Sequence, residues 1–174
     1  MEVPLAPPST PFVDYLISTF SSNPLAVDGA TGFETIASAN IDSRWTSGQW
    51  YMEFSPNHAN GAGTTGTILW QDSSGNEFVQ YLTSSGGYYR LRSGGTFHNL
   101  TGGSWSPGDV LTFVMDNIGG GCELLVNGVS VRTRVCSALT LINDTTFGAT
   151  PSFSNVIDAD IYQPIAGLPA GSVL

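Results

Sequence analysis

The stretch GDVLTFVMDNIGGGCELLVNGVSV, from Gly108 to Val131, decides the fold class. Apolar and polar residues alternate on both sides of a glycine-rich turn, and the second run ends at Asn127-Gly128, a dipeptide that strongly favours a two-residue hairpin turn. Two neighbouring antiparallel strands are therefore expected. Similar alternating runs lie between clusters of Gly, Ser, Asn and Pro at 50–54, 67–70, 77–83, 88–92, 110–116, 123–126, 129–135 and 156–162.

The composition also indicates an all-β domain. The 174 residues suit one β-sandwich, and the 21 glycines and 10 prolines favour turns between short strands. A short helix at 12–20 is the one helical element expected. We expect a Pro-rich N-terminal arm at 1–11, a single sandwich domain at 12–165 and a C-terminal tail at 166–174.

The charge balance excludes several classes of partner. The formal net charge is −9, and the five basic residues are all arginines. Nucleic acid is not an expected partner, because its affinity for proteins comes mostly from clustered basic side chains. An anionic membrane surface is disfavoured for the same reason, and no apolar run approaches the roughly 20 residues that span a bilayer. A phosphate-binding P-loop needs a lysine, and the chain has none.

The first hairpin that can be registered surrounds Gly86-Gly87, which suits a two-residue turn with positive φ. That register places Tyr81 opposite Arg92 and Thr83 opposite Arg90. One face then carries Tyr81, Thr83, Tyr88, Arg90 and Arg92. The other face carries Phe78, Leu82, Tyr89 and Leu91, and is the better candidate for the core.

The second hairpin turns at Asn127-Gly128, which pairs Val126 with Val129 and Leu124 with Val131. In this register Glu123 faces Arg132 on the outer side. Cys122 lies on the inner face with Leu124, whereas Cys136 falls on the outer face, in the same alternation as Arg132 and Arg134. We therefore expect two free thiols.

Three stretches carry a resemblance to known families. SGQWYMEF (Ser47 to Phe54) resembles the opening of SPRY-type domains, GDVLTFVMDNIGGGCELLVNGVSV resembles their later strands and those of laminin-G-like modules, and FGATPSFSNVIDADIYQ (Phe147 to Gln163) is similar to a closing strand. These families belong to the concanavalin A-like lectin and glucanase superfamily. The resemblance covers about residues 30 to 163 and implies an antiparallel, two-sheet jelly roll. SPRY domains bind peptides through loops and lectin relatives bind glycans, and the insert His58 to Gly66 departs from the SPRY pattern.

No catalytic or metal-binding residue is expected. The glucanase pattern Glu-x-Asp-x-x-Glu is absent, as is a G-x-S-x-G elbow, and neither His58 nor His98 has a ligand at metal spacing. Asp158 and Asp160 point the same way from one strand; we expect them to be solvated, and acid/base chemistry or a Ca²⁺ site there stays an alternative. No cofactor is implied.

The candidate ligand-binding residues are aromatic rings and guanidinium groups, which suit the flat faces and hydroxyls of sugars. They are Tyr81, Tyr88, Arg90, Arg92, Trp70, His98 and Trp105. Core packing is the alternative for Trp70 and Trp105, since aromatic residues are favoured in strands for packing alone.

These observations favour a non-enzymatic protein of the virion surface, such as a bacteriophage capsid decoration, head fibre or receptor-binding module. The surface composition is that of an extracellular protein, yet the N-terminal residues lack an export signal. The arm at 1–11 would dock onto a capsid or tail protein, and a homo-oligomer is expected. The alternatives are a stand-alone carbohydrate-binding module or lectin for a cell-surface glycan, located extracellularly, and a remote polysaccharide hydrolase or lyase.

Overall fold

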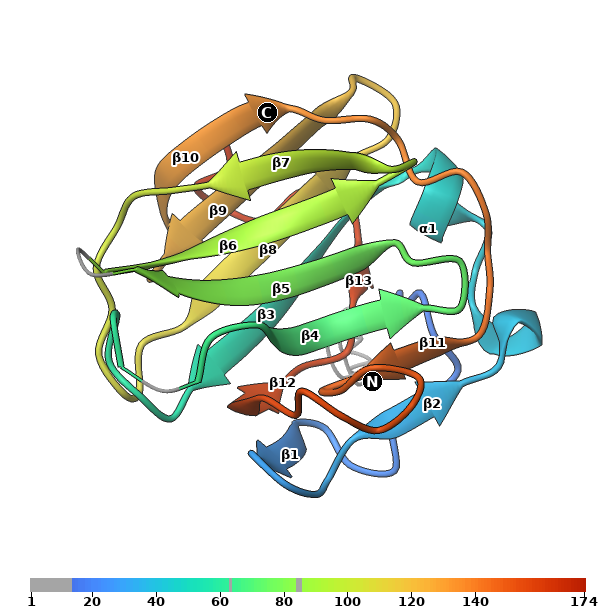
Figure 1. The fold of residues 1–174 in the computed structure, drawn as a ribbon. Coiled ribbons are helices and arrows are strands. Elements are labelled where there is room, and N and C mark those ends of the chain that lie inside the picture. The colour runs from blue at the N-terminus through green and yellow to red at the C-terminus, as the bar shows by residue number, and fades with distance from the viewer. Residues whose placement is uncertain (1–13, 63, 84–85) are drawn as a thin grey trace, which may run out of the picture.

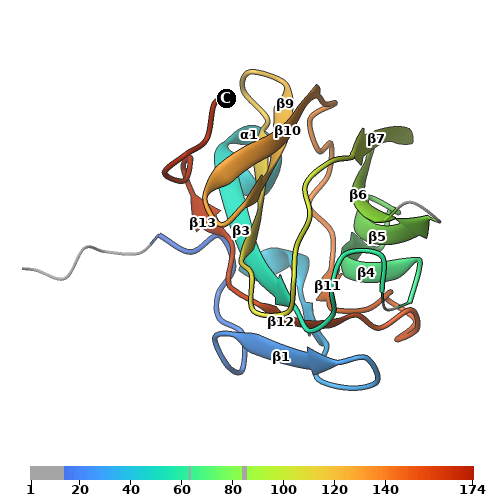
Figure 2. The same cartoon turned by 90° about the vertical axis from the view of Figure 1, so that its left-hand side faces the viewer.

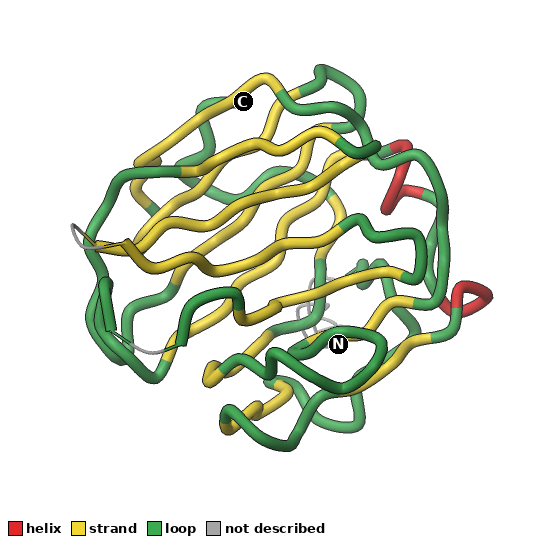
Figure 3. The backbone as a smooth tube through the Cα atoms, in the orientation of Figure 1, coloured by secondary structure: helices red, strands yellow, loops and turns green. Residues whose placement is uncertain are grey.

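The computed structural model describes residues 14–62, 64–83 and 86–174. The arm expected at 1–11 lies outside the described residues. Strands dominate the chain (Figure 3). They are β1 (Leu25–Asp28), β2 (Glu34–Ile36), β3 (Gln49–Pro56), β4 (Thr67–Asp72), β5 (Glu77–Thr83), β6 (Gly86–Ser93), β7 (Thr96–Leu100), β8 (Leu111–Asp116), β9 (Gly121–Val126), β10 (Val129–Val135), β11 (Thr145–Phe147), β12 (Asp158–Ile161) and β13 (Ile165–Ala166), with a 3-10 turn η1 (Ser38–Asn40) and a short helix α1 (Arg44–Ser47).

The strands form two antiparallel sheets that pack face to face, which confirms the predicted sandwich (Figures 1 and 2). One sheet has the order β1-β12-β3-β8-β9-β10, with β13 paired to β3 as its seventh strand. The other has the order β2-β11-β4-β5-β6-β7. Neighbours in both sheets come from distant parts of the sequence, as in β1 with β12 and β2 with β11, so the ends of the chain help to complete both sheets.

Aromatic rings fill the space between the sheets. Trp45 stacks on Trp50 with ring centroids 4.1 Å apart, and Phe78 stacks on Phe113 at 4.2 Å. These side chains are almost completely buried. Each large ring removes much apolar surface from water, which is the main source of stability in a domain of this size.

Two local expectations are wrong. Residues 14–20, part of the segment expected to be helical, instead form isolated bridges, Tyr15 to Ile165 and Ile17 to Ile41. In the first hairpin, Thr83 pairs with Gly86 and Tyr81 pairs with Tyr88, so Gly86 and Gly87 belong to β6 and not to the turn. Tyr81 thus pairs with Tyr88 in place of Arg92, a shift of four residues along β6. Because the shift is even, Tyr81, Tyr88, Arg90 and Arg92 stay on the same face.

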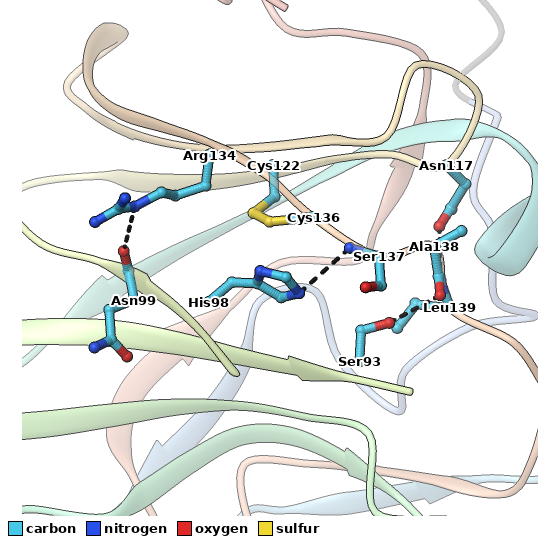
Figure 4. Close-up of a disulfide and its surroundings, with 10 residues drawn as sticks. All are labelled: Ser93, His98, Asn99, Asn117, Cys122, Arg134, Cys136, Ser137, Ala138 and Leu139. Carbon is cyan, nitrogen blue, oxygen red and sulfur yellow. Dashed lines mark hydrogen bonds between the residues drawn. A yellow bond between two sulfur atoms is a disulfide. The ribbon is translucent and has the colours of Figure 1, made fainter. Parts of the chain in front are cut away.

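The expected free thiols are also wrong, because Cys122 and Cys136 form a disulfide with Cα atoms 5.6 Å apart (Figure 4). The register of β10 against β9 shifts between Ser130 and Arg132, so that Arg132 and not Val131 pairs with Leu124. Beyond such a bulge every side chain moves to the other face of the strand. Cys136 therefore points inward, toward Cys122.

The same bulge changes how one edge of the sandwich closes. Arg132 and Arg134 now face inward, and their Nε atoms donate to the backbone oxygens of Thr101 and Asn99 in the opposite sheet. Glu123 does not pair with Arg132, as expected from the simple register. It is fully buried and accepts hydrogen bonds from the C-terminal tail instead.

The two terminal segments meet the seven-stranded sheet in different ways: the first described residues pair with β13 at its edge, and the tail packs on the outer face of β9 (Figure 2). Near the start of the described chain, Leu16 N donates to Pro164 O. In the tail, Ser172 Oγ donates to a carboxylate oxygen of Glu123 at 2.6 Å. The Leu174 side chain packs on Gly121 so closely that a Cβ atom at position 121 would lie 2.9 Å from it. The tail therefore covers the outer side of β9.

Among the residues the structure describes, no helix is long and apolar enough to cross a membrane.

Candidate functional site

The candidate site lies on the outer face of the six-stranded sheet, on β5, β6 and β7, which face the viewer in Figure 1. Phe78, Tyr89 and Leu91 point into the core, so the alternate residues of these strands point away from it. These outward residues include Glu77, Tyr81, Tyr88, Arg90, Arg92 and Phe97. We call them the Tyr/Arg face.

Two tyrosines form the centre of this face. Tyr81 and Tyr88 are directly paired across β5 and β6, and their rings stack with centroids 5.6 Å apart and planes tilted by 17°. Both side chains are partly exposed. Paired strand positions hold two rings side by side at little entropic cost, because each ring has only two side-chain torsions.

Arg90 is held firmly by its neighbours. Its guanidinium lies 4.1 Å from the ring centroids of both Tyr81 and Phe97, and it donates to the hydroxyl of Tyr81. An Oε of Glu77 is 3.9 Å from its terminal nitrogen, and Gln71 donates to the other carboxylate oxygen of Glu77 at 2.5 Å. The Arg90 side chain is only 21% exposed. It therefore acts as a spacer that fixes the two rings on either side.

Arg92 differs from Arg90, because no carboxylate of the described residues forms an ion pair with its guanidinium. Within the described part of the chain its guanidinium has no hydrogen bond and no ion pair; it lies beside Gly75 and 5.5 Å from the ring centroid of Phe97. Phe97 is 52% exposed. Glu77 lies opposite Arg92 in the register, but its carboxylate is directed to Arg90. A cation and an exposed ring therefore stand together at one end of the face.

A pocket of about 330 Å³ lies at the other end of β6, lined by Asn60, Gly86, Gly87, Tyr88, Thr101, Gly102 and Gly103. Asn60 fixes this pocket. Its backbone N donates to Trp105 O, its Nδ2 donates to Gly103 O at 2.9 Å, and its Oδ1 accepts from Gly87 N. One asparagine thus ties together the loop after β3, the start of β6 and the loop after β7.

Four of the seven sequence-predicted residues come together on this face: Tyr81, Tyr88, Arg90 and Arg92. Trp70 and Trp105 do not, because both are buried in the core. Their indole N–H groups have no acceptor among the described residues, and a ligand outside the sheet cannot reach them. Packing was the correct interpretation for both.

His98 also lies apart from this face. It is paired with Leu91 and therefore points inward at the edge of β7, where its Nε2 accepts from Ser137 N at 3.3 Å (Figure 4). Burial and the charge of Arg134 lower the pKa of the His98 imidazole. His98 thus belongs to the edge that the disulfide closes.

Sequence reasoning missed Phe97, Glu77 and Asn60. Phe97 had an available signal: the turn at Gly94-Gly95, both with positive φ, pairs Ser93 with Thr96 and hence Arg92 with Phe97. Asn60 had none, since its role depends on loops that meet only in the fold.

Asp158 and Asp160 lie on the outer face of the seven-stranded sheet, with Asp158 accepting from Asn57 Nδ2 at 2.7 Å. Across the described ranges, no group of three or more His, Cys, Asp and Glu side chains is placed to hold a metal ion.

No protein-family model matches this sequence, and no curated protein matches it. Solved structures do resemble the fold. The NanB sialidase from Streptococcus pneumoniae is 14% identical with a TM-score of 0.55, over 92% of this chain and 27% of the sialidase chain. The HCR/D F1240A mutant is 10% identical with a TM-score of 0.53, over 87% of this chain and 40% of the other.

A third similar structure is the CBM40 of the Ruminococcus gnavus IT-sialidase bound to α2,6 sialyllactose. It is 15% identical with a TM-score of 0.50, over 83% of this chain and 89% of the module. At such identities the likeness shows the fold alone. This chain spans about a quarter of the sialidase chain and most of the isolated module. The chain thus shares the β-sandwich fold of these structures.

Proposed function

We propose that this protein is a non-catalytic carbohydrate-binding module whose Tyr/Arg face binds a glycan carrying an acidic group. The observation that carries the proposal is the state of the five arginines. Arg44 pairs with Asp14 and Asp42, Arg90 with Glu77, and Arg132 and Arg134 donate to backbone oxygens. Within the described residues Arg92 alone has neither a hydrogen bond nor an ion pair.

In a chain with a net charge of −9, Arg92 is a cation that stands beside an exposed ring without a carboxylate partner among the described residues. Guanidinium groups bind carboxylates through two parallel hydrogen bonds, and such charged bonds contribute more than neutral ones. The exposed ring of Phe97 and the partly exposed ring of Tyr88 offer apolar surface of the kind that sugar rings pack against, whereas the Tyr81 ring already contacts Arg90 and Tyr88. The face therefore combines an anion-binding group with stacking surfaces.

The same face gives little support for catalysis. Its one carboxylate is Glu77, which is engaged by Gln71 and Arg90. The common mechanisms of glycoside hydrolysis use two carboxyl groups on either side of the scissile bond. We therefore propose binding and not hydrolysis.

The disulfide adds support for a role outside the reducing cytosol. Disulfides persist mainly in oxidising compartments, which is where cell-surface glycans are met. The carbohydrate module, an alternative in the sequence analysis, is accordingly preferred here. The virion location and docking through the arm stay predictions.

Isothermal titration with α2,6 sialyllactose and with lactose tests the proposal. We expect saturable binding of sialyllactose and much weaker binding of lactose, which lacks the carboxylate. Arg92→Gln should weaken sialyllactose binding about 10- to 100-fold, the range for loss of a charge-assisted hydrogen bond. Product analysis of the same mixtures should find no released sialic acid.

Val129→Glu is the matched control, because it also makes the net charge more negative by one while lying on β10, away from the Tyr/Arg face. It should leave affinity unchanged. The absence of sialyllactose binding, or equal losses in Arg92→Gln and Val129→Glu, would contradict the proposed site.

A further inference from the structure

The Tyr/Arg face and the pocket fixed by Asn60 share Tyr88, which lines the pocket and stacks on Tyr81. The outward residues of β6 follow one another from the pocket as Tyr88, Arg90 and Arg92. Gly87 and Arg92 are five positions apart in β6, a distance of about 17 Å along a strand. The free cation and the pocket therefore lie at opposite ends of one line, with the tyrosine pair between them.

The pocket differs chemically from the Arg92 end. Its lining carries no charged side chain, and four of its seven residues are glycines. At the four glycines the backbone itself forms the wall, and the other polar groups of the lining are the Asn60 amide and the hydroxyls of Tyr88 and Thr101. Gly102 needs to be glycine for its backbone, since its φ is +113°.

The pocket is also built before any ligand arrives. Asn60 holds the loop after β3, the start of β6 and the loop after β7 through its backbone N, Nδ2 and Oδ1. A second link supports the loop after β7, because Arg132 donates to Thr101 O at 2.6 Å. Preformed sites bind with less loss of conformational entropy than loops that must order on binding.

We infer that this pocket is a second subsite, which takes an uncharged sugar ring while the acidic sugar lies at Arg92 and Phe97. The inference rests on the proposed function and extends it: the face recognises an oligosaccharide with a charged end and a neutral end, and not a single acidic sugar. The neutral ring packs against Tyr88, and its hydroxyls meet backbone groups and Thr101.

The test compares free sialic acid with α2,6 sialyllactose by isothermal titration. The wild type should bind the trisaccharide about 10-fold or more tightly than free sialic acid, an increment typical of a few added contacts. Thr101→Trp fills the pocket with an indole, and should bring the affinity for sialyllactose to within about 2-fold of that for free sialic acid. Thr101→Ser, which keeps the hydroxyl, should retain the difference.

Amide resonances of Gly87 and Gly102 give a second measurement in the wild type. Sialyllactose should shift both resonances, and free sialic acid should shift neither. Circular dichroism of Thr101→Trp confirms that any loss is not unfolding, and its binding of free sialic acid should equal that of the wild type.

Equal affinity for the two ligands, or unchanged sialyllactose binding in folded Thr101→Trp, overturns the subsite and leaves the proposed function intact. If neither ligand binds the wild type, the acidic-glycan function fails and the subsite fails with it. The two failures are therefore distinguishable.

Discussion

Arg44 illustrates, at the scale of one residue, how the few cations of this acidic chain are used. Its terminal nitrogens contact Asp42 at 2.8 Å and Asp14 at 2.5 Å, so one guanidinium joins the first described residues to α1. Hydrogen bonds from the Arg44 side chain and backbone lower the pKa of Asp42 to about 2, and the Arg44 side chain also lowers the pKa of Asp14. The charged forms of both carboxyls are therefore the stabilising ones.

This cluster predicts a pH dependence of stability. A carboxyl whose pKa is lower in the folded state contributes stability above its unfolded pKa, and that contribution is lost as the pH falls through the folded pKa. The melting temperature of Arg44→Gln should therefore lie below that of the wild type at pH 7, and the difference should shrink between about pH 4 and pH 2. Melting curves across this range measure it.

Arg134→Gln serves as the control for that measurement. Arg134 donates to the Asn99 carbonyl, which does not titrate, so its effect on melting temperature should be constant between pH 4 and pH 2. A difference for Arg44→Gln that is equally constant would show that the two ion pairs contribute nothing through charge.

At the scale of elements, alternation along strands predicted more than the turns did. The runs at 50–54 and 77–83 lie in strands, as does 110–116 apart from Val110, and the face shared by Tyr81, Tyr88, Arg90 and Arg92 survives an error in the hairpin register. It survives because the face on which a side chain lies alternates along a strand, and the predicted register was wrong by an even number of residues.

The same rule explains what could not be predicted. The bulge between Ser130 and Arg132 adds one residue to β10, and an odd shift reverses every later side chain. No residue in the stretch VNGVSVRTRV, 126–135, indicates that a bulge occurs there. The strands β1, β2 and β11 were also missed, since each has only three or four residues and is stabilised by partners distant in sequence.

The bulge leads to a prediction about the two cysteines. Alkylation of the unreduced protein should label neither Cys122 nor Cys136, and alkylation after reduction should label both. Cys122→Ala with Cys136→Ala should lower the free energy of unfolding by about 3 kcal/mol, the value for closing a loop of this length. Mass spectrometry and denaturant titration make the two measurements.

Ser137→Ala is a suitable companion variant, because it lies in the same loop and leaves the disulfide in place. It should change stability by less than about 0.5 kcal/mol, as surface substitutions usually do. Two labels on the unreduced protein would mean that β10 runs without the bulge.

At the scale of the whole molecule, the two outer faces of the sandwich differ in what covers them. The first described residues pair along the edge of the seven-stranded sheet, where Leu16 N donates to Pro164 O, and the tail packs on its outer face, where it bonds to Glu123 (Figure 2). The Tyr/Arg face has no such cover within the described residues. The tail contacts and the candidate ligand-binding groups are thus placed on opposite sides of one core.

This separation predicts that stability and binding respond to different changes. Removal of residues 171–174 takes away both tail donors to Glu123 and the cover that Leu174 gives to β9. We expect a loss of about 1–3 kcal/mol in unfolding free energy, the range for a buried polar group that loses its partners. The affinity for sialyllactose should not change, because the Tyr/Arg face lies across the core.

Arg92→Gln should behave in the opposite way, with weaker binding of sialyllactose and an unaltered denaturation midpoint. Isothermal titration measures the affinity of both variants, and denaturant titration measures their stability. A truncated protein that loses binding while still folded would mean that the two faces are coupled through the core.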